Sequence, residues 1–451
     1  MNVFFTSLGC DKNLADTEAM LGILQREGYC FTDDEAQADI AVVNTCCFIG
    51  DAKEESVNAL LETAGLKKGR LKVLVAAGCL AQRYREEIQK EIPEVDAVVG
   101  TTAIEEIAVA VKEALEHRGG QHFRSLDAKP SVLCDRVLTT GGHFAYLKIA
   151  EGCDKHCTYC IIPKVRGNYR SVPMEGLVAQ AESLAGKGVR ELILVAQETT
   201  LYGVDLYGKK CLPELLRRLA GVQGIRWLRI LYCYPEEITE ELIEVMAAEP
   251  KVCHYLDVPI QHAADGVLKR MGRRTDEEEL RRMIGRLRER IPDICLRTTL
   301  ISGFPGETQE DFEELYRFVN EMEFDRLGVF LYSREEDTAA ALLPEQVPDD
   351  VKEARRGELM ELQQAISYEK GEAMVGRVLD VMVEGKVADE DVYVARTYRD
   401  APEVDGYLFL NTRRELMTGD FVKALVTGAN EYDLIGEPYE RENGEENEPT
   451  E

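Results

Sequence analysis

The chain has 451 residues, 45% of them hydrophobic, with 83 acidic residues against 54 Lys and Arg. This length allows about three domains, and we find no stretch of about 18 uncharged apolar residues and no basic segment at the N-terminus, so we expect a cytoplasmic protein without a signal peptide or membrane span. The formal net charge of -29 disfavours nucleic acid and favours a basic macromolecule as partner.

Residues 1–125 alternate short apolar runs with helical patterns, which predicts a doubly wound parallel sheet. Cys10, Cys46 and Cys79 each close one of its predicted strands at the carboxyl end. Ligands of open α/β sheets bind in the crevice outside these strand ends. We therefore expect the three cysteines to converge at one edge of the sheet.

After a connecting segment near residues 130–143, the same alternation resumes and continues through a linking helix that ends near residue 370. Six strand–helix units are too few for a closed eight-stranded barrel. Residues 140–370 therefore predict a partial (β/α)6 barrel, whose chemistry would lie at the carboxyl ends of its strands.

Residues 371–437 contain short alternating runs separated by Gly and Asp turns, which predict a small antiparallel β-barrel of a kind that often binds RNA or another macromolecule. The stretch from Val375 to Glu437 carries seven Lys and Arg against thirteen Asp and Glu, and this balance favours a basic protein over RNA. Residues 438–451 have six Glu and almost nothing apolar, so we expect an acidic disordered tail.

Cys153, Cys157 and Cys160 form a C-x3-C-x2-C set in a loop that follows a predicted strand. A four-iron cube needs four ligands, so three thiolates leave one iron open. S-adenosylmethionine (SAM) can chelate that iron, and an electron from the cluster can then split its sulfonium to give a 5′-deoxyadenosyl radical. The alternative is a zinc site with His156 as fourth ligand, but zinc sites usually contain two separated cysteine pairs.

Seven motifs resemble the radical-SAM methylthiotransferases over essentially the full length of the chain: "SLGCDKNLADTE" (7–18), "VVNTC" (42–46), "AAGC" (76–79), "EGCDKHCTYCIIPKVRG" (151–167), "AQETTLYG" (196–203), "VPIQH" (258–262) and "ISGFPGET" (301–308). The resemblance implies an enzyme with two [4Fe-4S] clusters and SAM, in which Cys10, Cys46 and Cys79 hold an auxiliary cluster whose open iron carries the sulfur to be transferred. Cys46 is preferred to its neighbour Cys47 because only Cys46 matches the "NTC" of the family.

Within the family, the chain is most similar to the enzymes that methylthiolate the β-carbon of an aspartyl residue in small-subunit ribosomal protein twelve. A radical is needed there because that C–H bond has no acidic proton. The resemblance also implies a reductant such as flavodoxin or ferredoxin. The branch that modifies tRNA adenosine, the main alternative, has Gln-Met where this chain has Asp11 and Lys12. A cluster-holding electron carrier is a more distant alternative.

This chain departs from its own branch in two places, since the branch commonly has Pro at the position of Asp11 and Asp at that of Glu198. The expected SAM contacts follow strand ends or lie in the cluster loop: Tyr159, Gln197, Glu198 and Gly303. In "ISGFPGET", Gly303 and Gly306 permit close backbone approach, or form a simple turn, and Thr308 is a candidate N-cap.

Other chemistry-bearing residues have simpler interpretations. We expect His262 to be structural and "KRMGRR" (269–274) to be a solvated loop. Six cysteines have no motif around them and are expected in the core: Cys30, Cys134, Cys211, Cys233, Cys253 and Cys295.

Overall fold

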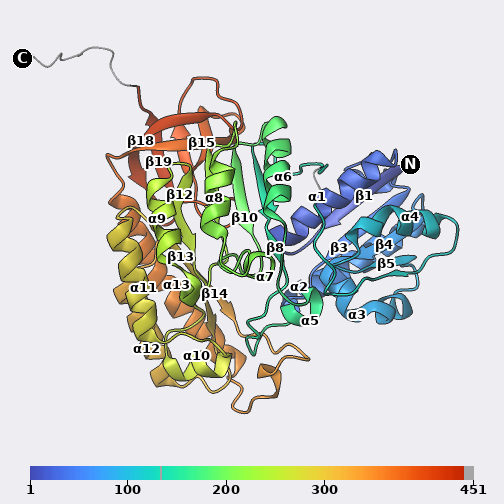
Figure 1. Ribbon diagram of the computed structural model, residues 1–451, viewed down its shortest axis with the longest axis horizontal. Coiled ribbons are helices and arrows are strands. Elements are labelled where there is room, and N and C mark those ends of the chain that lie inside the picture. Colours follow the sequence, from blue (N-terminus) through green and yellow to red (C-terminus); the bar gives the residue numbers. More distant parts are fainter. Residues whose placement is uncertain (133–134, 441–451) are drawn as a thin grey trace, which may run out of the picture.

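The computed structural model describes residues 1–132 and 135–440. Figure 1 shows an N-terminal sheet in blue, a central sheet from green to orange, and a C-terminal barrel in red at one end of the central sheet. Cys134 lies outside the described residues, as does the predicted tail from residue 441 onward. In the described part, no helix has both the length and the apolar character that crossing a bilayer requires.

The N-terminal unit is the predicted doubly wound sheet, with six parallel strands in the order β2-β1-β3-β4-β5-β6. Its helices cover both faces: α1 (Asp11–Arg26) and α4 (Ile107–Leu115) share one apolar cluster, and α2 (Gly50–Gly65) and α3 (Gly78–Glu91) share another. The strands are β1 (Asn2–Ser7), β2 (Cys30–Phe31), β3 (Ile40–Thr45), β4 (Val73–Ala77), β5 (Ala97–Val99) and β6 (Gln121–His122).

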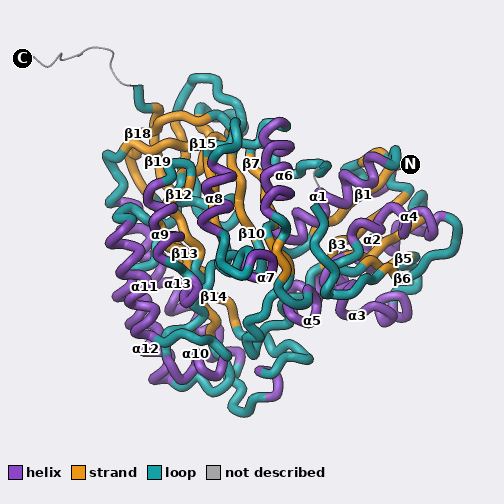
Figure 2. Tube along the Cα trace, in the orientation of Figure 1, coloured by secondary structure: helices purple, strands orange, loops and turns teal. Residues whose placement is uncertain are grey.

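The central unit is the predicted partial barrel of six parallel strands in the order β14-β13-β12-β11-β10-β7. The strands are β7 (Phe144–Lys148), β10 (Glu191–Val195), β11 (Trp227–Ile230), β12 (Val252–Asp257), β13 (Cys295–Ser302) and β14 (Arg326–Leu331). Helices line the outer side of this sheet (Figure 2): α6 (Met174–Gly186), α8 (Leu212–Ala220), α9 (Glu240–Ala248), α11 (Glu277–Arg290), α12 (Gln309–Met322) and α13 (Asp349–Glu372).

Shorter elements lie in the loops at the carboxyl ends of these strands. They are β8 (Ala150–Glu151), α5 (Ile162–Arg166), β9 (Arg170–Ser171), α7 (Val204–Tyr207) and α10 (Asp265–Met271).

The C-terminal unit is a closed barrel in the order β15-β16-β17-β19-β18. The prediction of an antiparallel barrel is right for four of its strand pairs but wrong for β17 and β19, which run parallel. Directions cannot alternate all the way round a ring with an odd number of strands, so one pair has to be parallel. The strands are β15 (Val378–Lys386), β16 (Val392–Thr397), β17 (Leu408–Asn411), β18 (Phe421–Ala429) and β19 (Leu434–Pro438).

Buried ion pairs attach this barrel to the amino ends of the central strands. Glu191 accepts hydrogen bonds of 2.7 Å from Arg229 of the central sheet and from Arg396 of the barrel, and all three side chains are fully buried. Burial acts to raise the pKa of Glu191, but the two guanidiniums outweigh it and lower that pKa. Trp227 meets Phe421 of the barrel edge to face, with 4.8 Å between ring centroids.

We predict that Arg396→Met weakens this attachment by about 3–5 kcal/mol, because it leaves a buried carboxylate short of a partner. Trp227 is the only tryptophan and lies at the interface. The urea concentration at the midpoint of its fluorescence change therefore measures the loss of stability. Arg413→Met is the control, because Arg413 is 91% exposed in its pair with Asp391 and should change stability by less than about 0.5 kcal/mol. Equal midpoints for the two variants would contradict the prediction.

Candidate active site

The structure brings Cys10, Cys46 and Cys79 to one edge of the N-terminal sheet, after the neighbouring strands β1, β3 and β4. Cys10 is the N-cap of α1, Cys46 directly follows β3, and Cys79 lies in the first turn of α3. The loop before Cys10 packs closely on Cys46, since a Cβ added to Gly9 would lie 2.9 Å from the Cys46 sulfur. Each of Cys10 and Cys46 raises the pKa of Cys79, so the three thiols act on one another.

Cys47 has a different environment from Cys46. Its side chain is completely buried in the apolar cluster that α2 and α3 form on the sheet, and burial raises its pKa. Cys46 instead faces Gly9 and Cys10 and keeps 7% exposure. This geometry supports Cys46 as the ligand.

A fully buried arginine contacts the first set of cysteines. Arg166 donates from Nε to the sulfur of Cys79 at 3.3 Å, and its guanidinium also binds Asn13, Asp16 at 2.8 Å and Glu151 at 3.1 Å. Burial raises the pKa of Cys79 to about 12, and Arg166 acts in the opposite direction. A cation beside a cysteine favours the thiolate, which is the form that binds metal.

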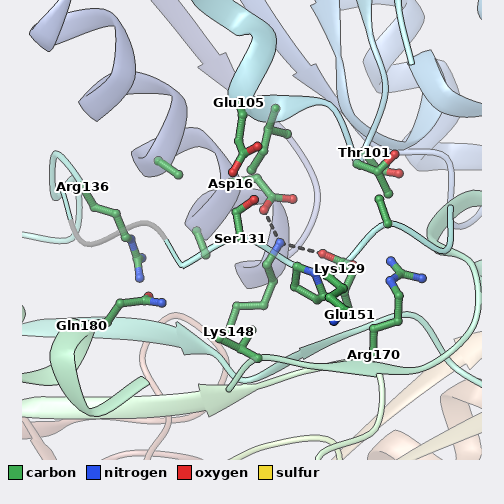
Figure 3. A pocket seen from close by; sticks show the side chains of 17 residues that line it. Asp16, Thr101, Glu105, Lys129, Ser131, Arg136, Lys148, Glu151, Arg170 and Gln180 are labelled. Atoms are coloured by element: carbon green, nitrogen blue, oxygen red, sulfur yellow. Dashed lines mark hydrogen bonds and ion pairs between the residues drawn. The ribbon is translucent and has the colours of Figure 1, made fainter. Parts of the chain in front are cut away.

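Arg166 belongs to a quartet of buried charges at the junction of the two sheets, which we call the junction quartet: Asp16, Lys148, Glu151 and Arg166. Figure 3 shows Lys148 between the carboxylates of Asp16 and Glu151, and its ammonium is 2.6 Å from Glu151. Two positive and two negative charges balance beside a cavity of about 70 Å³. The quartet joins α1 to β7, β8 and α5.

The second set, Cys153, Cys157 and Cys160, lies in the loop between β8 and α5. Burial raises the pKa of Cys153 to about 12, and Lys155 acts in the opposite direction. The Cys157 sulfur is 3.1 Å from the hydroxyl of Tyr234. A bound metal centre would shift these thiols to thiolates by its own charge.

Neither set has the geometry of a single-ion site. Within residues 1–132 and 135–440, no three His, Cys, Asp or Glu side chains converge on a point that suits one metal ion. His156, the fourth ligand of the zinc alternative, is exposed. The ligands of a four-iron cube bind separate corners of a larger body, so a cluster does not require the three sulfurs to meet at one point.

Glu198 offers an unused acceptor beside the second set. Its side chain is fully buried, one oxygen accepts the Thr200 backbone N–H at 2.9 Å, and the other oxygen has no hydrogen-bond partner. Burial raises its pKa to about 7, and Glu198 in turn raises the pKa of Cys153. A buried acceptor without a donor is costly, so this atom fits an ammonium or hydroxyl of a bound ligand such as SAM.

The other expected SAM contacts differ in whether their side chains are free to bind a ligand. Both ends of the Gln197 amide are engaged, since it accepts from the Gly152 N–H at 2.8 Å and donates to Glu151 at 3.2 Å. Gln197 therefore fixes the start of the cluster loop. Tyr159 packs edge to face on Phe304, with 6.4 Å between centroids, which brings the cluster loop next to Gly303.

"KRMGRR" (269–274) was expected to be a solvated loop, and that expectation is wrong, because residues 269–271 end α10, where Met271 is fully buried, and Arg273 is buried too. Arg273 is 7% exposed and stacks over Tyr234 at 4.2 Å from the ring centroid, because the loop folds back onto the second cysteine set. Thr308 is confirmed as the N-cap of α12, in a capping box with Asp311. His262 is fully buried, accepts from the Ala264 N–H at 3.0 Å and has a pKa that burial lowers to about 3, which agrees with a structural role.

The cysteines without motifs are mostly in the core, as expected: Cys211, Cys233, Cys253 and Cys295 are buried. Cys30 is exposed, contrary to the expectation, because it begins the two-residue edge strand β2. Sequence reasoning also missed Arg166, although it lies within the 151–167 motif, and Tyr232 and Tyr234, whose strand end carries no recognisable pattern.

Family models match three stretches of the chain: "Uncharacterized protein family UPF0004" over residues 2–100, "Radical SAM superfamily" over 147–319 and "TRAM domain" over 375–438. Among curated relatives, the "Ribosomal protein uS12 methylthiotransferase RimO" of Lachnoclostridium phytofermentans is 60% identical, over 97% of this chain and 99% of that protein. Its counterpart from Pelotomaculum thermopropionicum is 52% identical, with the same coverage of both chains.

Solved structures support the fold. The radical S-adenosylmethionine methyltransferase TsrM of Kitasatospora setae, solved with cobalamin and a [4Fe-4S] cluster, is 16% identical with a TM-score of 0.55, over 76% of this chain and 77% of that one. OxsB, a cobalamin-dependent radical enzyme, is 14% identical with a TM-score of 0.51, over 82% of this chain and 56% of that one.

We predict that Gly303→Ala destabilises the protein by about 1–3 kcal/mol, measured as the free energy of unfolding in urea. Gly303 has a φ of +72°, and an added Cβ would lie 2.1 Å from the Lys352 side chain. Gly357→Ala is the matched control: nothing lies within 4 Å of its added Cβ and it is in the middle of α13, so we expect stabilisation by about 0.5–1 kcal/mol. A neutral Gly303→Ala would show that the loop tolerates the side chain.

Proposed function

Since the chain belongs to the RimO family of ribosomal protein uS12 methylthiotransferases, we propose that its two cysteine sets hold two separate [4Fe-4S] clusters. The chain is a radical-SAM enzyme that transfers a methylthio group. Cys153, Cys157 and Cys160 would bind the cluster that takes SAM, and Cys10, Cys46 and Cys79 the auxiliary cluster. When bound, the first supplies the electron that cleaves SAM and the second holds the sulfur.

The observation that carries this proposal is the pair of spaced three-thiol sets that one buried network connects. Arg166 touches Cys79 of one set and Glu151, and Gln197 links Glu151 to Gly152 at the start of the other cluster loop. Glu198, with its free buried oxygen, would bind SAM, and Tyr159 and Gly303 would flank it. We assign residues 1–125, 140–370 and 371–437 to the auxiliary-cluster, radical-SAM and barrel domains.

We propose that the substrate is an aspartyl residue of uS12, with flavodoxin or ferredoxin as the reductant. A basic face on the C-terminal barrel would favour tRNA instead, but two of its arginines are unavailable. Arg396 is bound to Glu191, and Arg399 is bound to Asp325 at 2.7 Å, both in the attachment to the central unit. Mass spectrometry of uS12 and of tRNA after incubation with the reconstituted enzyme distinguishes the two substrates by the mass of one methylthio group.

We expect the triple variant Cys153→Ala, Cys157→Ala, Cys160→Ala to retain roughly half of the iron and to lose SAM cleavage, because one of two clusters loses all its ligands. Iron per chain and 5′-deoxyadenosine are the two measurements. The matched control is Cys211→Ala, which changes a buried cysteine at the start of α8, outside both sets. Unchanged iron in the triple variant would disprove the assignment.

Cys46→Ala should separate the two halves of the reaction. The variant keeps the second cysteine set and the SAM contacts, so we expect 5′-deoxyadenosine on reduction but no methylthiolated uS12. Cys47→Ala should keep product formation, because Cys47 packs in the apolar cluster. If the two variants behaved in the opposite way, Cys47 would be the ligand.

The barrel should attract uS12 through exposed acids on the loop between β15 and β16. Truncating the barrel is a poor test, because it would remove Arg396 from the buried Glu191 and the Thr397 and Tyr398 carbonyls from the buried Arg229. We expect joint replacement of Asp389, Glu390 and Asp391 by their amides to weaken uS12 binding roughly tenfold at low salt and to flatten its salt dependence. Arg413→Gln, on the same barrel, is the control and should not weaken binding; tight tRNA binding by the unaltered enzyme would contradict the assignment.

A further inference from the structure

One short stretch of chain touches both cysteine sets. In residues 231–235, which follow β11, the hydroxyl of Tyr234 is 3.1 Å from the Cys157 sulfur, and that of Tyr232 is 3.3 Å from Asp11, the residue after Cys10. The two tyrosines therefore lie between the two proposed clusters, where the reacting carbon of a substrate has to be held.

Tyr232 is fixed there in an unusual backbone conformation. Its φ is +61°, a region that a bulky residue rarely adopts. Its N–H donates to Asp257 at 3.0 Å, and its carbonyl accepts from the Thr199 N–H at 3.1 Å. Such strain persists only when surrounding contacts impose it, and it is concentrated at functional sites.

Lys12 lies on the ring of Tyr232. Its ammonium is 3.2 Å from the ring centroid and 2.7 Å from Asp11, and the residue is 6% exposed. Asp11 is its one carboxylate partner in the described part of the chain, and the other oxygen of Asp11 is buried without a hydrogen bond. An ammonium has three donors, so Lys12 keeps capacity for a second acceptor.

Most other buried cations of this region already have carboxylate partners; Arg273, on the face of Tyr234, has none in the described part of the chain and donates to the Pro259 carbonyl at 2.8 Å. Lys148 and Arg166 share Asp16 and Glu151, and Arg297 contacts Asp257 and Asp405. At the first cysteine set, Lys12 is thus the cation that can bind a further carboxylate at the smallest cost.

We propose that Lys12 binds the side-chain carboxylate of the aspartyl substrate. Asp11 holds the Lys12 ammonium in place until the substrate carboxylate displaces Asp11. The inference rests on the proposed function. The carboxylate is the one charged group on an aspartyl side chain, and it is bonded directly to the β-carbon. Binding the carboxylate therefore also positions the reacting C–H bond. An adenosine has no such group, and Lys12 thereby also determines specificity.

Calorimetry tests the assignment of Lys12 by measuring how tightly uS12 binds to the full-length, cluster-loaded enzyme. The probes are uS12 and its variant with Asn at the target aspartate. We expect the unaltered enzyme to prefer the Asp form about tenfold, since a buried charge left without its partner is disfavoured. Lys12→Met should bind both forms equally, and Lys12→Arg should keep most of the preference.

Lys155→Met is the matched control, because Lys155 lies over the ring of Tyr234, at 4.7 Å, on the other side of the same stretch. It should keep the Asp preference. Asp11→Asn removes the competing carboxylate and should increase the preference several-fold, which keeps the test usable if Lys12→Met does not fold.

The Lys12 assignment is overturned if Lys12→Met retains the preference of the unaltered enzyme, or if Asp11→Asn leaves it unchanged or lower. It is also overturned if the unaltered enzyme modifies uS12 without preferring Asp over Asn. An unaltered enzyme that adds no methylthio group to uS12 would instead refute the proposed function.

Discussion

The contact on which the rest of the site depends is that of Arg166 with the charges around it. This single guanidinium, 1% exposed, binds Cys79 and Asp16 of the N-terminal unit and Glu151 of the central unit. Removing it would leave two buried carboxylates with one lysine between them, and a buried charge without a partner typically costs several kcal/mol. The relative position of the two cysteine sets is therefore set by directional charge contacts together with the apolar packing of Ile161 and Val165 on the N-terminal unit.

The same principle appears at the other end of the central sheet. Glu191 binds one arginine from its own sheet and one from the C-terminal barrel, so the barrel is held at a defined angle to the strands. This attachment also changes what the barrel can recognise. Arg396 and Arg399 are charged residues that a count from the sequence assigns to the surface, yet both face the central unit. Asp400 and Asp405 are buried in the same attachment, paired with Arg326 and Arg297, so the remaining surface of the barrel keeps the acidic balance of its composition.

The sequence predicted the features that depend on periodicity and strand order. Alternating apolar runs predicted both parallel sheets, and cysteines at strand ends predicted their convergence, because side chains that follow adjacent parallel strands meet at one edge. Burial of charged residues has no such periodic signal. Arg166, Arg273 and Lys12 look like ordinary surface cations in the sequence, and only tertiary contacts show that each is enclosed by carboxylates or tyrosine rings. The prediction for Cys30 was wrong in the opposite direction. It was expected in the core but is exposed, because a two-residue edge strand has too few neighbours to bury it.

The distribution of charge follows a pattern that neither composition nor fold class implies. The chain as a whole carries -29, yet each cysteine set has a lysine and an arginine close to it: Lys12 and Arg166 at the first, Lys155 and Arg273 at the second. Thiolates in a weakly polar interior need nearby positive charge, and three of these four cations lie on tyrosine faces. The acidic exterior thus favours a basic protein, while single buried cations beside the cysteine sets favour thiolates, and Lys12 is placed to receive the carboxylate of the residue that is modified.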